Sequence, residues 1–352
     1  MTADPLPTFG APRTSAPVGR RLLTRALAKP SLAAVLGLVV VVLFFGLRTH
    51  GLVSSDGVAS VLDVAATIGI GGVAVALLLI AGQFDLSIGA VAIASALMTG
   101  LLVRYADWGI WPSLAVSLAA ALAVGAANGL LVVSTGLPSF LTTLATYLVL
   151  EGITLAAAHQ VDPGATVGGL QSAPGWASAT AVFDSSVRLG GGRYSISLLW
   201  WLAFTAVATW TLWRTRFGNA VFAIGGARRA ARELGVRVGA TTVTLFCLTA
   251  TAGWLIGTLA LVPTGGVHVT AGLGQEIGFV VVAVIGGCLL TGGYGSTIGA
   301  AVGALIYAVA RVGMRLAGWE SPWFQALLGA MLLVALLANG VVRSRLRAAP
   351  RS

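Results

Sequence analysis

Residues 58–80 read VASVLDVAATIGIGGVAVALLLI, and Asp63 is the only charged residue among them. An α-helix needs about 20 consecutive apolar residues to cross the hydrocarbon core of a bilayer. The run is therefore predicted to be a transmembrane helix. The chain around it has the same character, with 57% hydrophobic and 9% charged residues. Soluble domains carry about a quarter charged residues, so the solvent for most of this chain is lipid.

Ten apolar segments can be marked in this way, which predicts an all-α integral membrane protein with about ten transmembrane helices. Segment 277–290 ends in a glycine-rich stretch and is expected to be a broken or re-entrant helix, which a membrane tolerates only where protein or a water-filled cavity surrounds it. The segments are 32–47, 58–80, 87–103, 112–134, 139–158, 197–213, 241–262, 277–290, 297–316 and 323–342.

The charges predict the sidedness of these segments. The net charge is +10, and 15 of the 21 basic residues lie in a tail, residues 1–31, in the internal loop 214–240, and in the tail 343–352. With ten spans, all three regions fall on one side, which the positive-inside rule assigns to the cytoplasm. The N- and C-termini are therefore predicted to be cytoplasmic, flanking a permease domain at 32–342. The same placement explains the positive charge without nucleic acid as a partner.

The sequence lacks the residues that several classes of protein function require. The chain has no phosphate-binding loop of the form G-x-x-x-x-G-K-[ST], since its one lysine is Lys29. Cys247 and Cys288 have no neighbouring Cys or His at metal-ligand spacing, so no metal site is predicted. No catalytic residue and no bound cofactor are predicted either. The energy for transport would then come from a separate polypeptide that hydrolyses ATP.

That polypeptide would have to bind the cytoplasmic face, where the loop 214–240 is the longest predicted connection. Gly225 and Gly226 are expected to start a short helix, residues 227–234, and Gly235 to cap its end. The alternative is a simple basic loop. On the outer side, residues 159–195 form the longest connection, which is either part of a docking surface or an unstructured connector.

Five stretches, in order, resemble motifs of the permeases of monosaccharide ABC importers, the ribose, xylose and galactose class. Residues 82–89, GQFDLSIG, resemble G-G-I-D-L-S-V-G of that family. The other four resemble A-x-N-G-L-L-I, I-P-P-F-I-A-T-L-G-T, T-x-F-G…A-I-G-G-N-x-x-A-A-R and I-G-G-T-S-L-S-G-G-R-G-S. In this chain they read ANGLL at 127–131, LPSFLTTLAT at 137–146, TRFG at 215–218 with AIGG at 223–226 and AAR at 230–232, and IGGCLLTGGYGS at 285–296.

The resemblance implies a fold like that of type II ABC importers and a homodimer with a second permease copy. It also implies a cytoplasmic ABC ATPase bound below and an extracytoplasmic sugar-binding protein above. Departures from the family motifs at Gln83, Phe84, Ala227, Arg229 and Tyr294 indicate a divergent subfamily. The short cytoplasmic helix is implied to be the coupling helix seated in the ATPase, with Gly225, Gly226, Arg228, Arg229, Ala230, Ala231, Arg232, Glu233 and Gly235 as the residues of the coupling loop.

A neutral sugar needs hydrogen-bonding groups and aromatic faces along its pathway, not fixed charges. Asp85 is a candidate, although capping of a broken helix through backbone N–H groups is the simpler role for it. For the other polar candidates, hydrogen bonds between helices are the alternative to pathway lining. The remaining pathway candidates are Asn128, Phe140, Thr142, Thr143 and Thr146. Glycines expected to allow close packing are Gly286, Gly287, Gly292, Gly293 and Gly295.

Two other functions stay open at this level. One is the permease of a branched-chain amino-acid importer, a sister family. The other is a carrier or channel that works alone. A carrier driven by protons normally has acidic or histidine relays in its core, and only Asp63, Asp85, Glu151 and Arg311 lie in or beside the spans.

Overall fold

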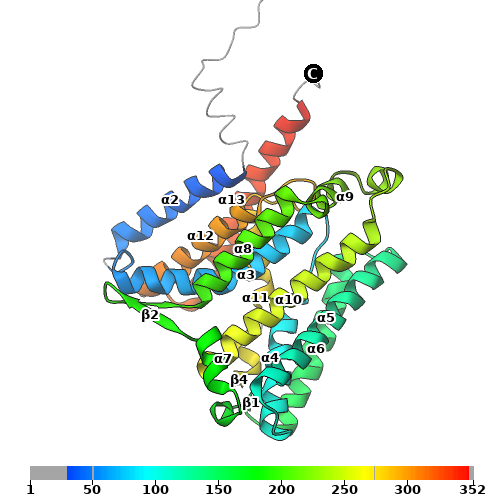
Figure 1. Ribbon diagram of the computed structural model, residues 1–352. Helices are drawn as coiled ribbons and strands as arrows, with labels where there is room; N and C mark the ends of the chain where they lie inside the picture. The colour runs from blue at the N-terminus through cyan, green and yellow to red at the C-terminus, as the bar shows by residue number, and fades with distance from the viewer. Residues whose placement is uncertain (1–29, 50, 273, 349–352) are drawn as a thin grey trace, which may run out of the picture.

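The computed structural model describes residues 30–49, 51–272 and 274–348, and it is mostly helical (Figure 1). Most of the predicted N-terminal tail, residues 1–29, lies outside the described residues, as do residues 349–352 of the predicted C-terminal tail. The long helices are α2 (Pro30–Arg48), α3 (Ser55–Ile80), α4 (Ile88–Tyr105), α5 (Ile110–Thr135), α6 (Ser139–Val161), α8 (Ser197–Arg214), α9 (Arg216–Glu233), α10 (Val238–Thr264), α11 (Gln275–Ile285), α12 (Thr297–Leu316) and α13 (Ser321–Ala348).

Each of the ten predicted segments coincides with one of these helices. Seven helices among the described residues are long and apolar enough to cross a membrane: α3, α4, α5, α6, α10, α12 and α13. The apolar part of α2, Ala34–Arg48, and the whole of α11 are shorter. The chain is therefore a multi-pass membrane protein, while the count of ten spans and the side of each terminus stay predictions. α13 continues to Ala348, so the helix extends into the predicted tail at 343–352.

Helix α3 forms the centre of the structure, in contact with α8, α10, α11 and α12. In its most apolar stretch 83% of the residues are buried, against 11% in α6 and none in α13. Small residues make this position possible. A Cβ atom on Gly71 would overlap the ring of Phe279 in α11, so the absence of a side chain lets the two helices approach closely.

A second group of helices lies beside this centre and contains the residues of the candidate site. α10 packs along α5 and α4, and α4 also contacts α5 and α6. α6 is at the edge of this group, with Leu148, Val149 and Ile153 each about 60% exposed. Its large apolar face is therefore free to contact lipid or another protein.

The connection between α6 and α8 is folded, which excludes the unstructured connector among the two alternatives. It contains β1 (Thr166–Val167), η1 (Leu170–Ser172), α7 (Trp176–Phe183), β2 (Ser186–Leu189) and β3 (Gly192–Ser195). β2 pairs with β3, and β1 pairs with β4 (Val267–His268), which leads into η2 (Val269–Gly272). The expectation of an all-α fold is thus corrected by these two small antiparallel pairs.

Aromatic side chains hold this connection to the helices. The indole N–H of Trp200 in α8 donates to the carbonyl of Val182 at 3.0 Å, and its ring stacks on Phe183 at 5.6 Å between centroids. Trp111 in α5 donates to the Ser178 hydroxyl at 2.8 Å. In Figure 1, α7 and the β pairs lie at the opposite end of the molecule from α9 and the end of α13.

The contact between α3 and α11 predicts the effect of a single methyl group. Gly71→Ala should lower the free energy of unfolding by about 1–3 kcal/mol, because a methyl group forced into a filled core displaces the Phe279 ring. Thermal unfolding of the purified protein in detergent measures this. Gly329→Ala in α13 is the matched control, since no atom lies within 4 Å of its Cβ position, and it should leave stability unchanged or slightly raised. Equal melting temperatures for the two variants would contradict this account of the packing.

Candidate functional site

The candidate site is built around the break between α3 and α4, residues 81–87. α3 ends because Gly82 adopts a left-handed conformation, with φ of 72°. The N–H of Gly82 then donates to the carbonyl of Leu79, and that of Gln83 to the carbonyl of Leu78, both at 2.9 Å. This pair of bonds is a Schellman motif, which closes a helix at a glycine.

The freed backbone groups of the break are satisfied by side chains of α6. The N–H of Phe84 donates to the Ser139 hydroxyl at 2.9 Å, and the N–H of Leu86 donates to the Thr143 hydroxyl at 3.1 Å. Non-helical backbone at membrane depth is tolerated only where protein or water supplies such partners. The first turns of α6 therefore hold the break in place.

Asp85 lies at the centre of the break and is 2% exposed. Its Oδ1 atom accepts hydrogen bonds from the N–H of Ser87 at 2.8 Å and from the Ser87 hydroxyl at 2.6 Å. Its Oδ2 atom accepts from the Thr249 hydroxyl of α10 at 2.6 Å. One of these three bonds is to backbone and two are to side chains, so the carboxylate both caps the break and ties it to α10.

The chain of bonds continues from Ser87 into α5 and α6. Asn128, which is 1% exposed, donates from Nδ2 to the Ser87 hydroxyl at 2.9 Å. Its Oδ1 atom accepts from the Thr146 hydroxyl at 2.6 Å. A single polar network, made of Asp85, Ser87, Asn128, Thr146 and Thr249, thus joins the break to α5, α6 and α10.

The structure brings four of the six pathway candidates together, since Thr143 also bonds the break. Thr142 donates only to the Pro138 carbonyl of its own helix, at 3.3 Å, and Phe140 lies at the surface, 46% exposed. Asp85, Asn128 and Thr143 are buried, and each forms a hydrogen bond to another helix or to the break. This is the geometry of interhelical hydrogen bonding. A part in the substrate pathway stays a prediction for all six.

Sequence reasoning missed Thr249, Ser87 and Ser139 as partners. Ser87 lies within the motif at 82–89, and Ser139 lies within that at 137–146, so both could have been chosen from their motifs. Nothing in the sequence marks Thr249 among the other threonines of its apolar segment, because its partner Asp85 is far away along the chain.

The other side of the break meets a junction of glycines, which we define as Gly82, Gly225, Gly292 and Gly293. The N–H of Gly293 donates to the carbonyl of Ile80, the last residue of α3, at 2.8 Å. A Cβ atom on Gly225 in α9 would overlap both this carbonyl and the N–H of Gly293. Three segments far apart in sequence therefore meet backbone to backbone at this point.

The stretch after α11 forms its part of this junction through glycines at positive φ. Gly287, Gly292 and Gly293 have φ of 92°, 81° and 76°. A Cβ on Gly292 would lie 2.8 Å from the Cα of Gly82. Gly286 and Gly295 do not have a positive φ, but neither has room for a side chain. A Cβ atom on Gly286 would strike the backbone of Gly299 and Ala300, and one on Gly295 would strike the side chains of Cys288 and Ile80.

Helix α9 differs from the predicted short helix, residues 227–234. It starts earlier, at Arg216, because the Thr215 hydroxyl accepts from the N–H of Gly218 at 3.2 Å and caps the helix there. Ala227 breaks it, with φ of −157° and ψ of 85°. Gly225 and Gly226 thus end the first half of α9, and the second half, which begins after Ala227, lies within the predicted range 227–234.

The second half of α9 presents charge to the outside. Gly235, at φ of 82°, follows its end, and the N–H of Val236 donates to the carbonyl of Ala231 at 3.0 Å, so the predicted glycine cap is present. Ala231 is buried, whereas Ala230, Arg232 and Leu234 are exposed. Arg229 bonds Glu233 at 3.3 Å with both side chains largely exposed, and Arg228 is half-buried. Pairs of this exposed kind contribute little to stability.

Comparisons with known proteins agree over most of the chain. A family described as branched-chain amino acid transport system / permease component matches residues 57–336. The fructose import permease protein of Rhizobium meliloti is 30% identical over 326 residues, which cover 90% of this chain and 87% of the relative. The ribose import permease protein of Bacillus subtilis is 29% identical over 308 residues, covering 86% and 91%. No solved structure matches the chain.

The polar network predicts a measurable coupling between Asn128 and Thr146. Asn128→Leu and Thr146→Val should each destabilise the protein, and the double variant should lose less than the sum, with a coupling of about 0.6–1.7 kcal/mol as found for polar pairs in membranes. Unfolding of the four proteins in detergent gives the cycle. Thr244→Val is the control for Thr146→Val, because the Thr244 hydroxyl donates only to the Ala240 carbonyl of its own helix. Strict additivity of Asn128→Leu with Thr146→Val would show that the bond between them carries no energy.

Proposed function

The chain belongs to the family of branched-chain amino acid transport system permease components, and on that premise we propose that it is the membrane-spanning subunit of an ATP-driven importer of a monosaccharide. It is a multi-pass protein of the bacterial inner membrane. The relatives named above are import permease proteins, and hydrolysis of ATP by a separate subunit is part of the proposal. The specific sugar, the partners and their roles are part of the proposal.

The observation that carries the choice of substrate is the similarity, over 86–90% of the chain, to permeases whose names give fructose and ribose. The family description names branched-chain amino acids instead, so both substrate classes need weighing. An amino acid zwitterion carries two charges and would be matched by counter-charges in a low-dielectric pathway. In the described break, the carboxylate of Asp85 is already occupied by Ser87 and Thr249. A neutral polyhydroxylated solute fits this arrangement better.

The energy for import is proposed to come from a cytoplasmic ABC ATPase that binds α9 and uses the ATP itself. The exposed end of α9, with Arg229, Arg232, Glu233 and Leu234, offers charged and apolar groups to such a partner. This surface is connected to the membrane part through the glycine junction. The sequence has no phosphate-binding loop of its own.

The glycine junction suggests how a push on α9 could reach the pathway. Gly225 lies against the last carbonyl of α3 and against Gly293, so the first half of α9 has no side chain there to absorb a displacement. Movement at this point would shift the end of α3 and, with it, the break at 81–87. The polar network then carries the shift to α5, α6 and α10.

The remaining partners of the proposal have their own surfaces. The folded connection between α6 and α8 lies at the end of the molecule opposite to α9 (Figure 1), where an extracytoplasmic sugar-binding protein would dock. A second copy of the permease would cover an exposed apolar face such as that of α6, where Leu148, Val149 and Ile153 lie. Such a dimer would enclose the passage between its two subunits.

Reconstitution tests the substrate class directly. The permease, its cognate ATPase and its binding protein are placed in proteoliposomes, and uptake of labelled pentoses, hexoses and leucine is measured with and without ATP. We expect ATP-dependent uptake of one sugar. Uptake of leucine but no sugar would favour the amino-acid alternative, and uptake driven by an ion gradient without the ATPase would favour a carrier that works alone.

The coupling proposal makes a prediction for two adjacent glycines. Gly225→Ala should reduce ATP-dependent uptake by about tenfold or more, since its methyl group would strike the backbone of Ile80 and Gly293 and reposition α9. Gly226→Ala is the matched control, because no atom lies within 4 Å of its Cβ position, and it should retain uptake. Binding of the ATPase, measured by co-purification, should survive in both variants. Equal uptake by the two variants would argue against transmission through this contact.

A further inference from the structure

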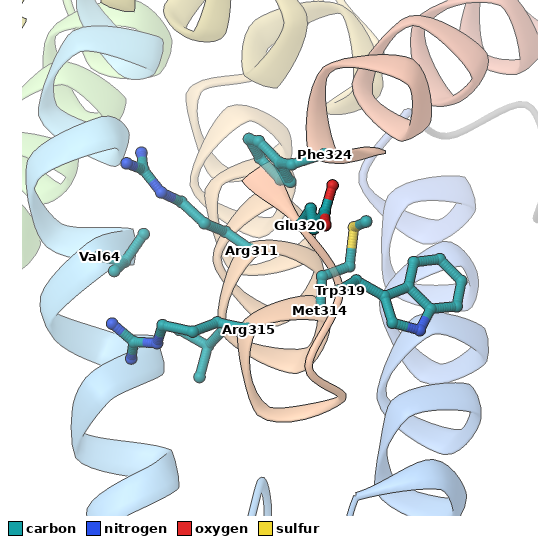
Figure 2. A pocket seen from close by; sticks show the side chains of 8 residues that line it. Val64, Arg311, Met314, Arg315, Trp319, Glu320 and Phe324 are labelled. Carbon is teal, nitrogen blue, oxygen red and sulfur yellow. The ribbon is translucent and has the colours of Figure 1, made fainter. Parts of the chain in front are cut away.

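A cavity of about 320 Å³ lies at the C-terminal end of α12, between α3 and the start of α13. Its lining includes Arg311, Arg315, Trp319, Glu320, Phe324 and, from α3, Val64. Figure 2 shows both guanidinium groups extending from α12 toward α3, while Glu320 lies on the side of the helix away from them. The cavity therefore presents two positive charges from one face of one helix, and with the Glu320 carboxylate at its other side the lining carries one net positive charge.

These charges are poorly compensated. Arg311 donates from Nη1 to the Tyr307 hydroxyl at 3.4 Å, a long bond, and its guanidinium carbon lies 5.8 Å from the centre of the Phe324 ring. Neither arginine forms an ion pair within the described part of the chain. The carboxylate of Asp63, next to Val64, accepts from the Ser197 hydroxyl of α8 at 3.1 Å and so serves another contact. Most of the guanidinium N–H groups are thus free for a ligand.

The position of the pair fits the level of lipid headgroups, because both arginines lie in the last two turns of α12. Arg311 lies five residues before the end of α12 at Leu316, which places it about 8 Å below that end at 1.5 Å per residue. Trp319 and Trp323 are 49% and 62% exposed just beyond it, as is typical of the membrane–water interface. The cavity is also lined by Val64, Val312 and Met314, which suit the start of an acyl chain.

We propose that this cavity binds the phosphodiester headgroup of an anionic phospholipid in the leaflet reached by the end of α12. Guanidinium groups match phosphate oxygens through paired hydrogen bonds, and two of them spaced one helical turn apart can hold one phosphate from two sides. The apolar lining receives the first carbons of the chains. A folded partner protein would place its carboxylates at the level of the loops, above the cavity, so the depth of Arg311 favours lipid.

The test uses the full chain purified in a neutral detergent. Its unfolding temperature is measured on titration with phosphatidylglycerol, with phosphatidylcholine of the same acyl chains, and with inorganic phosphate. We expect a saturable rise with phosphatidylglycerol and none with the other two. Arg311→Gln combined with Arg315→Gln should weaken binding, so that the half-saturating concentration of phosphatidylglycerol rises by about tenfold or more. Native mass spectrometry counts the lipids that the protein retains. It gives a second readout of binding that does not depend on a cooperative unfolding transition of the variant.

Arg104→Gln is the matched control, because Arg104 is an exposed arginine in the last turn of α4 that lies over Tyr105 and lines no part of this cavity. It should keep the wild-type response. An equal rise with phosphatidylcholine, or an unchanged response in the double variant, would overturn the proposal. A double variant that binds phosphatidylglycerol normally but fails to bind the extracytoplasmic partner would reassign the arginines to protein docking and overturn it as well.

Discussion

The rest of the structure depends on one constraint, which is that backbone polar groups released inside a bilayer must find partners within the protein. At residues 81–87 the chain leaves helical geometry between two long apolar helices. Its N–H groups are taken up by Ser139, Thr143 and Asp85. Each unsatisfied group would cost several kcal/mol in hydrocarbon. The break can therefore exist only while α6 stays against it, and the position of α6 is determined by this requirement more than by its own burial.

The same constraint explains why the side of the break that faces α9 is made of glycine. A side chain at Gly225 or Gly292 would separate the backbones that now meet, and the bond from Gly293 to Ile80 would be lost with them. The two faces of the break thus use opposite devices, polar side chains on one and the absence of side chains on the other. Both produce the same result, a short non-helical segment that cannot shift without moving its neighbours.

Sequence reasoning predicted the helices well because hydropathy is a local property, and each of the ten apolar segments is helical. In segment 277–290 the helix ends at Ile285, just before the glycines that the sequence marked, while a broken or re-entrant course through the membrane stays a prediction. Sequence reasoning failed where contacts are distant in sequence. The pairing of β1 with β4 joins strands about a hundred residues apart, and the bond of Thr249 to Asp85 spans 164 residues. The exposure of Phe140 could not be predicted, since the sequence does not say which face of α6 meets α4 and α5.

The placement of charge follows from the low dielectric of the membrane. Asp85 is the buried acid of the break, and three hydrogen bonds disperse its charge where no cation is paired with it in the described chain. Arg311 and Arg315 show the opposite solution, since they lie near a helix end where long side chains reach the interface. The Asp85 carboxylate already accepts three hydrogen bonds and so has little acceptor capacity left for a solute. Guanidinium groups without counter-charges, by contrast, attract an anionic ligand. The centre of the protein is therefore built to hold its own geometry, and its edge is where charge is available to a ligand.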